Sequence, residues 1–286
     1  MTILVTGARG NVGRHVVEGL VRKGARVRAL TRDPARAGFS DGVEVVRGDL
    51  SRLDSCRTAL EGVTAMYLFP LAYRTSDVQS FADVAVNTEV PGLAAEAGVR
   101  RIVLLSSNAV LYGADEHHQQ AEAAVEASGL EYTHLRSGEF AMNKLFGWGE
   151  SIRKEGVVRS GFPEVVGVPI HQADVAAVAV VALLEDGHQG RGYELTGPQA
   201  LTEREQVGEI AAGCGRGIRF EELTPEQARE NWLAQGMPAE VVDEMMAHSA
   251  HFAEKAPVVR NTVQEVTGRP ARTLRQWAAD HAKLFR

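Results

Sequence analysis

The residues best suited to bind a ligand form a glycine-rich stretch near the start of the chain. Gly7, Gly10 and Gly13 follow the apolar run 3–5 and precede a segment with helical periodicity. Gly7 permits a tight turn, Gly10 lets backbone amides approach an anion, and Gly13 lets the helix pack closely on the strand. The helix start adds amides and the positive end of its dipole. We therefore predict a dinucleotide-binding loop rather than a purely structural turn, with contacts from Thr6, Gly7, Arg9, Gly10, Asn11 and Val12.

A basic residue follows the second predicted strand, where a dinucleotide-binding fold selects its cofactor. An acidic residue there would bind the ribose hydroxyls of NAD, whereas an arginine can bind the 2′-phosphate of NADP. Arg32 stands at this point, and Arg9 lies in the neighbouring loop. We expect NADP(H) as the cofactor. The alternative is that Arg32 is a solvated side chain beside Asp33.

Further cofactor contacts are expected after the third and fourth strands. Ligands of parallel sheets lie at the carboxyl ends of the strands. Asp49 is placed to accept a hydrogen bond from the adenine amino group, or alternatively to cap the following helix. The remaining contacts predicted from position are Leu50, Leu68, Phe69 and Pro70.

Short β-branched runs alternate with helical segments over the first two-thirds of the chain. Strands are expected at 3–5, 26–30, 43–47, 65–69, 102–105 and 132–135, and helices near 11–23, 54–60, 78–97 and 117–127. This alternation predicts an α/β fold, a doubly wound parallel Rossmann sheet. Residues 1–140 would form the dinucleotide-binding core, and residues 141–286 would complete the sheet and add a smaller, mostly helical substrate-binding part.

Aromatic residues beyond the sixth strand suggest where a substrate binds. Phe140, Asn143 and Trp148 follow that strand, and Trp232 lies in the mostly helical segment 224–254. An apolar cleft with a few polar groups suits a planar aromatic ligand. The alternative is that these side chains only pack a small helical subdomain.

Composition excludes several classes of function. The net charge of −6 and the pI near 5.9 argue against nucleic acid as a partner. Cys56 and Cys214 are far apart and have no metal-binding spacing, so we expect neither a disulfide nor a metal. The longest apolar run, 175–184, is shorter than the roughly 20 residues that cross a bilayer and predicts a buried helix. Because the sequence shows no signal-peptide pattern at its start, we expect a cytoplasmic monomer or homodimer with no membrane partner.

With these residues placed, the chain resembles the NmrA-like group of atypical short-chain dehydrogenase/reductase proteins. The resemblance is carried by the glycine loop, Arg32 and the segment 48–50. It extends to the stretch 127–140, which is similar to the group's strand-six motif, and to the segments 174–178 and 193–198. The group includes quinone reductases, reductases of aromatic natural products, and redox-sensing regulators that bind cofactor without turnover. The resemblance implies a Rossmann fold that binds NADP(H).

The resemblance also shows which catalytic residues are missing. Catalytic members of the superfamily carry a serine, a tyrosine that donates the proton, and a lysine. In this chain Asn108 stands at the serine place, after Ser106 and Ser107, while Ala114 and His118 stand at the tyrosine and lysine places. The resemblance makes Ser106 and His118 cofactor contacts. Ser107, Asn108 and His118 are then the candidate catalytic residues.

Three functions are compatible with this pattern. The first is an NADPH-dependent ketoreductase or quinone reductase acting on an aromatic, polyketide-type carbonyl of the kind found in antibiotic biosynthesis. Its proton would come from water, His118 or the substrate's own phenol. The second is an NADP(H)-sensing regulatory protein without turnover. The third is a non-redox enzyme on the same fold.

Overall fold

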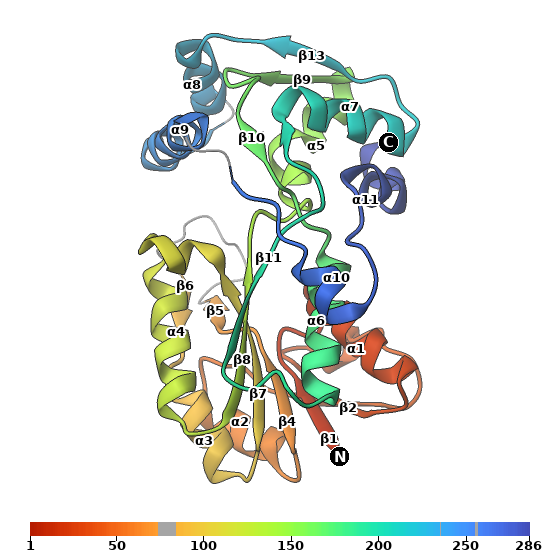
Figure 1. Cartoon of the computed structure of the whole chain (residues 1–286), viewed down its shortest axis with the longest axis vertical. Coiled ribbons are helices and arrows are strands. Elements are labelled where there is room, and N and C mark those ends of the chain that lie inside the picture. Colours follow the sequence, from red (N-terminus) through yellow and green to blue (C-terminus); the bar gives the residue numbers. More distant parts are fainter. Residues whose placement is uncertain (74–83, 235, 255–256) are drawn as a thin grey trace. The chain divides into compact units, whose positions relative to one another are not determined.

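The computed structural model describes residues 1–73, 84–234, 236–254 and 257–286. These residues form two compact units, shown in Figure 1. The first unit contains Met1–Gly138, Gln172–Leu195 and Thr262–Arg269. The second contains Glu139–His171, Thr196–Asn261 and Pro270–Arg286.

A parallel sheet of seven strands is the centre of the first unit, which confirms the predicted Rossmann-type α/β class. Its strand order is β11-β8-β7-β4-β1-β2-β3. The order reverses between β4 and β1, because the chain builds one half of the sheet on each side of β1. The strands are β1 (Thr2–Val5), β2 (Arg26–Thr31), β3 (Val43–Arg47), β4 (Ala65–Leu68), β7 (Arg101–Ser107), β8 (Glu131–Ser137) and β11 (Arg191–Leu195). The six predicted strands are all present, and β11 is an additional edge strand.

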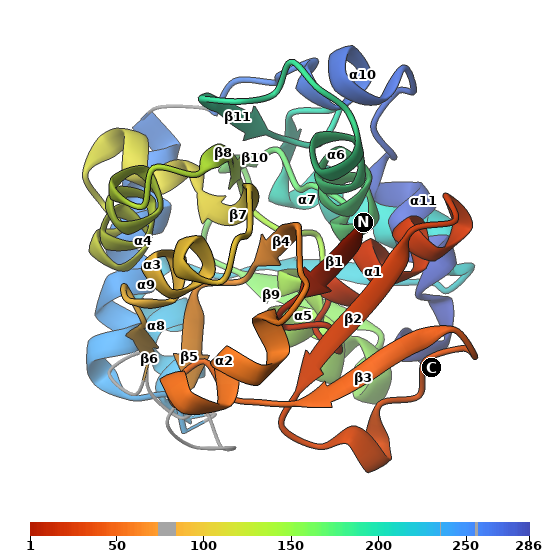
Figure 2. The same ribbon diagram turned by 90° about the horizontal axis from the view of Figure 1, so that it is seen from below.

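Helices cover both faces of this sheet (Figures 1 and 2). On one face α2 (Leu53–Leu60), α3 (Val90–Glu96) and α4 (Glu116–Ala127) pack on the sheet. The buried cluster beneath them contains Leu4, Leu60, Met66, Leu93, Ile102, Leu104 and Val125. On the opposite face lie α1 (Gly13–Arg22) and α6 (Gln172–Leu184), which contact each other. Because α6 is buried along most of its length, the prediction of a buried helix at 175–184 is confirmed.

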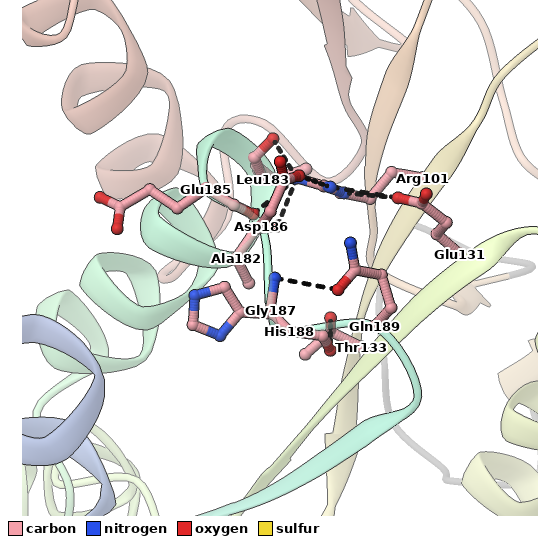
Figure 3. Close-up of polar contacts among 10 residues, drawn as sticks. All are labelled: Arg101, Glu131, Thr133, Ala182, Leu183, Glu185, Asp186, Gly187, His188 and Gln189. Carbon is pink, nitrogen blue, oxygen red and sulfur yellow. Dashed lines mark hydrogen bonds and ion pairs between the residues drawn. The ribbon is translucent and has the colours of Figure 1, made fainter.

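Arg101 ties the end of α6 to the amino ends of two strands (Figure 3). Its Nη1 donates to the carbonyl of Glu185 at 2.7 Å, and its Nη2 pairs with Asp186 at 2.6 Å and with Glu131 at 3.1 Å. Thr133 donates from its hydroxyl to the carbonyl of His188 at 2.8 Å. Helix ends leave carbonyls without helical partners, and a guanidinium satisfies them well. This cluster is therefore a structural cap at the amino ends of the strands, opposite the end that carries the glycine loop.

The helix predicted at 78–97 is only partly confirmed. Residues 84–86 form strand β6 (Val84–Val86), which pairs antiparallel with β5 (Leu71–Tyr73). The helix in this region, α3, begins only at Val90, and Pro91 lies in its first turn. Proline suits that position because it lacks the amide that the first turn leaves unpaired. The part of the prediction on 78–83 lies outside the described residues.

The second unit combines helices with two small two-stranded sheets. In these sheets β9 (Val157–Ser160) pairs with β13 (Arg219–Glu222), and β10 (Val166–Gly167) pairs with β12 (Leu201–Thr202). The helices are α5 (Asn143–Glu155), α7 (Glu203–Cys214), α8 (Pro225–Ala234), α9 (Ala239–Glu254) and α11 (Leu274–Asp280). Trp277 and Phe285 are fully buried in its core. Helices α8 and α9 account for the predicted helical segment 224–254.

Among the described residues, no helix is long and apolar enough to span a membrane.

Candidate functional site

The glycine loop has a backbone that side chains would obstruct. Gly7 has a φ of +55°, which a residue with a Cβ adopts only at a cost. A Cβ on Gly10 would lie 3.0 Å from the Gly7 carbonyl oxygen, and a Cβ on Gly13 would lie 2.2 Å from the same atom. The Gly10 amide donates to that oxygen at 2.8 Å, which holds the turn closed. The loop therefore leaves a backbone-lined cradle at the start of α1, which fits a pyrophosphate.

Thr6 joins this loop to the end of β4. Its amide donates to the Tyr67 carbonyl at 3.0 Å, and its Oγ1 accepts from the Phe69 amide at 2.8 Å. The Phe69 Cβ would lie 3.0 Å from a Cβ on Gly7, so this side chain covers the turn. Thr6 is buried, whereas Arg9, Gly10 and Asn11 are exposed. These bonds lie where the strand order reverses, which is the usual ligand position in such sheets.

Arg32 follows β2 on the same edge of the sheet. Its side chain is exposed, and within the described ranges it forms no ion pair. Asp33 instead lies 3.5 Å from the Nε of Arg36, and its amide donates to the Thr31 hydroxyl at 3.2 Å. Thus Arg32 is not held by Asp33, and its guanidinium is available to a phosphate.

Asp49 shapes the turn after β3. Its Oδ1 accepts from the Ser51 amide at 2.9 Å and from the Ser51 hydroxyl at 2.8 Å. The cap position of α2 is Arg52, which makes no side-chain cap, so the alternative of Asp49 as helix cap is wrong. Leu50 is buried, and its carbonyl accepts from the Asn87 side-chain amide at 2.5 Å. The adenine-contact role of Asp49 stays a prediction.

Leu68 and Pro70, the other two residues expected to border the cofactor at this end of the sheet, are both buried, and Phe69 between them is partly exposed.

Ser106 is engaged in a structural network. Its hydroxyl donates to Oε1 of Glu122 at 2.6 Å, and Arg136 binds both oxygens of that carboxylate at 3.0 and 2.6 Å. Burial would raise the pKa of Glu122, but the hydrogen bonds from Arg136 and Ser106 outweigh it and lower that pKa. These bonds connect β7, β8 and α4. The Ser106 hydroxyl is therefore committed to the fold.

Ser107 and Asn108 lie where β7 ends. Ser107 accepts from the Ala109 amide at 3.1 Å and caps the short 3-10 helix Asn108–Tyr112. Gly138 directly follows β8. A Cβ added to this glycine would lie 3.4 Å from the side-chain nitrogen of Asn108, so the Asn108 amide is close to the end of β8. Tyr112 is 66% exposed. These residues place polar groups at the carboxyl ends of β7 and β8.

His118 lies in the first turn of α4 and contacts Asp115. The carboxylate of Asp115 accepts from the His118 amide at 3.1 Å through Oδ1, while its Oδ2 lies 2.7 Å from the ring Nδ1. Burial would raise the pKa of Asp115, but the hydrogen bonds from the His118 ring and amide and from the Ser107 hydroxyl outweigh it and lower that pKa. Sequence reasoning missed Asp115. The available signal was an acidic residue three positions before a histidine, at a helix start.

Three possible metal ligands meet between α4 and β8. In the part of the chain that is described, ligand atoms of Glu122, Glu126 and His134 lie within 4.8 Å of one another. Burial lowers the pKa of His134, whose Nε2 lies 3.1 Å from Glu126. Arg136 already supplies positive charge to Glu122 through a bidentate ion pair. We interpret this cluster as structural.

The predicted substrate residues all lie in the second unit. Phe140 and Trp148 pack against its buried core, and the Lys144 ammonium lies 4.7 Å from the centre of the Trp148 ring. Asn143 is exposed at the start of α5, and Trp232 stacks on Phe162 with ring centres 6.5 Å apart. Lys144, which pairs with Glu139 at 2.5 Å, was not predicted from the sequence.

The parallel sheet and its glycine loop define a dinucleotide-binding Rossmann protein. Residues 7–186 match the model of the NAD(P)H-binding family. A (4-alkanoyl-5-oxo-2,5-dihydrofuran-3-yl)methyl phosphate reductase of Streptomyces griseus is 41% identical over 292 residues, which cover 99% of each chain. The NAD(P)H azoreductase of Xenophilus azovorans is 32% identical over 99% of each chain.

Solved structures agree with these relatives. The NADPH-dependent quinone oxidoreductase of Escherichia coli, solved with NADPH, has a TM-score of 0.80 and 25% identity, covering 98% of this chain and 99% of that one. The chain therefore belongs to the NAD(P)H-binding family, in agreement with the fold and cofactor that the resemblance to the NmrA-like group implied. The expectation of NADP(H) agrees with the match to the NAD(P)H-binding family, and the predicted class, an NAD(P)H-dependent oxidoreductase, is confirmed.

Proposed function

We propose that the protein is an NADPH-dependent reductase of a conjugated carbonyl compound, either a quinone or an aromatic, polyketide-type ketone. The observation that supports this most is the imidazole of His118, which is held by Asp115 and stands at the place that the resemblance assigns to the superfamily's catalytic lysine. Conjugated carbonyls suit such a site because their reduction gives a delocalised oxyanion. That oxyanion needs a weaker acid than an isolated alkoxide does.

The chemistry divides between the cofactor and the chain. When bound, the reduced nicotinamide supplies a hydride to the electrophilic carbon. As the new carbon–hydrogen bond forms on the conjugated system, its π electrons shift toward the carbonyl group, and the electron pair collects on the carbonyl oxygen as an enolate or phenolate oxyanion. In this proposal His118 gives that oxygen a proton and is reprotonated by water. Ser107 and Asn108, at the end of β7, orient the oxygen by hydrogen bonding, and Arg32 binds the 2′-phosphate of the cofactor.

The substrates named for the relatives support a conjugated electrophile as the substrate of this protein. Their names refer to an alkanoyl furanone phosphate, to azo compounds and to a quinone. Each of these is a conjugated acceptor of two electrons. We assign substrate contacts in the second unit to Phe140, Asn143, Trp148 and Trp232, because their aromatic faces and one amide suit a flat, partly polar molecule.

A second candidate substrate is favoured by one comparison. The 41% identity to the Streptomyces griseus reductase extends over 99% of both chains. A conjugated furanone carrying an alkanoyl group and a phosphate is therefore the alternative to a quinone. Both candidates need the same hydride and the same proton.

The test is loss of NADPH absorbance with a panel of quinones, hydroxyaryl ketones and alkanoyl furanones with and without phosphate. We expect turnover with at least one conjugated carbonyl, and a loss of about 10²-fold in kcat for His118→Gln. His117→Gln is the matched control, because this neighbour is exposed. A protein that binds NADPH yet oxidises it with no member of the panel would contradict the proposal and favour a cofactor sensor.

A further inference from the structure

The two oxygens of the Asp115 carboxylate bind two different atoms of His118. Oδ1 accepts from the backbone amide of His118 and thereby caps α4. Oδ2 lies 2.7 Å from the ring Nδ1. The two side chains are 22% and 14% exposed, so water competes weakly with both contacts. A carboxylate that also caps a helix has little freedom to rotate. The position of the imidazole is therefore fixed by the same group that starts the helix.

A neighbouring group of the sheet lies beside this pair. The Ser107 hydroxyl contributes to the lowered pKa of the Asp115 carboxyl, and the same hydroxyl accepts from the Ala109 amide. Ser107 is the last residue of β7. The Asp115 carboxylate, at the start of α4, therefore lies near the carboxyl end of a central strand. That edge of the sheet also carries the glycine loop.

This geometry determines which ring nitrogen carries the proton. A carboxylate at its usual charge can only accept, so a ring nitrogen 2.7 Å away from it must donate. The neutral imidazole therefore carries its hydrogen on Nδ1. The Nε2 atom is left as the one that exchanges a proton with a ligand.

We propose that Asp115 is a positioning residue that holds His118 as an Nδ1–H donor and thereby makes Nε2 the proton donor to the reduced substrate. This assignment rests on the proposed function. In the step itself the Nε2–H bond of the protonated ring breaks, and an O–H bond forms on the substrate oxyanion. The neutral ring keeps its Nδ1 hydrogen bond to Asp115 until water returns the lost proton.

The neighbouring charged groups leave Asp115 as the partner of the ring. Glu122, one turn further along α4, is occupied by Ser106 and Arg136. Glu116 is exposed in the first turn of the same helix. On β7, the group that influences the Asp115 carboxyl is the hydroxyl of Ser107, which carries no charge.

Asp115→Asn tests the inference because asparagine keeps the cap and reverses the ring contact. Asparagine caps helices about as well as aspartate. With its oxygen on the His118 amide, its NH2 group stands at the place of Oδ2 and donates to Nδ1. The neutral ring then carries its hydrogen on Nε2, and its Nδ1 faces an amide instead of a carboxylate. Glu116→Gln, which removes an adjacent exposed carboxylate, is the matched control.

The primary readout is the ring-nitrogen chemical shifts of His118, measured by NMR on the full chain with and without NADP. We expect the Nδ1–H tautomer in the unmodified protein and in Glu116→Gln, and the Nε2–H tautomer in Asp115→Asn. We also expect kcat of Asp115→Asn to fall by about 10²-fold, as for His118→Gln, with the NADPH dissociation constant and the melting temperature unchanged.

Two results would overturn the inference. One is an unchanged tautomer in Asp115→Asn, and the other is a wild-type kcat and pH profile in that variant while His118→Gln is impaired. Failure of the proposed function is distinguishable from both, because the unmodified protein would then show no turnover while the tautomer is still measured. A loss of kcat in Asp115→Asn together with the changed tautomer supports the positioning role.

Discussion

Replacement of Gly13 by alanine should impair cofactor binding without unfolding the protein. The new Cβ would stand 2.2 Å from the Gly7 carbonyl oxygen and 2.8 Å from its carbonyl carbon. Both atoms belong to backbone, so no side chain can rotate away. Relief of the overlap requires the loop or the start of α1 to move by about 1 Å, since well-packed atoms do not approach so closely.

A displacement of that size removes hydrogen bonds from the loop. Amides that donate to an anion at about 2.9 Å would move beyond bonding range. Each hydrogen bond to a charged group contributes roughly 1.5–3 kcal/mol. Loss of one such bond raises the dissociation constant by about 10- to 100-fold. We therefore expect Gly13→Ala to bind NADPH at least about tenfold more weakly than the unmodified protein.

The assay is a fluorescence or calorimetric titration with NADPH, accompanied by thermal unfolding. Gly92→Ala is the matched control, because Gly92 lies in α3 of the same unit and a Cβ added to it would meet no atom within 4 Å outside its own helix backbone and chain neighbours. This control should bind NADPH normally and melt at the same or a slightly higher temperature. An unchanged dissociation constant in Gly13→Ala would refute the steric reasoning about the loop.

Three further predictions concern single side chains. Arg32→Ala should raise the dissociation constant of NADPH by about 10- to 100-fold and leave that of NADH nearly unchanged, so equal losses in the two titrations would exclude a 2′-phosphate contact. Glu122→Gln should destabilise the protein by roughly 1–3 kcal/mol at neutral pH. Because the folded-state pKa of Glu122 is lowered, its contribution is present above the unfolded-state value and is lost as the pH falls through the folded-state value. The melting-temperature difference between Glu122→Gln and the unmodified protein should accordingly shrink below about pH 4, and a difference that grows on acidification would contradict this. Thr273→Ala should cost about 1 kcal/mol in thermal unfolding, because it removes the capping box of α11, and should leave NADPH binding intact.

The central sheet could be predicted because its signals are local. Buried parallel strands are apolar runs, such as those that became β1, β4 and β7, and the glycine spacing follows from steric limits near one carbonyl. Strand β11 lacks such a run because it lies at the sheet edge and is partly exposed. Its pairing with β8 depends on the rest of the sheet rather than on its own residues.

The other differences between the predicted and the observed elements arise from contacts between residues that are far apart in the sequence. The periodicity around 78–97 favoured a helix, yet Val84–Val86 pairs with a second segment, and the useful signal was Pro91 in the first turn of α3. The spacing of Asp115 and His118 predicts a helix cap, but the orientation of the ring depends on side-chain rotamers and on packing against β7.

The division of the first unit between distant stretches of sequence affects how it forms during synthesis. Strand β8 ends at Ser137, but its neighbour β11 and the covering helix α6 come from residues 172–195, after a segment of the second unit. Until those residues leave the ribosome, β8 is an unpaired edge and Arg101 lacks the carbonyls that it caps. Unpaired edges promote association with other chains. Chaperone protection of the nascent chain should therefore matter most between the emergence of residue 137 and that of residue 195.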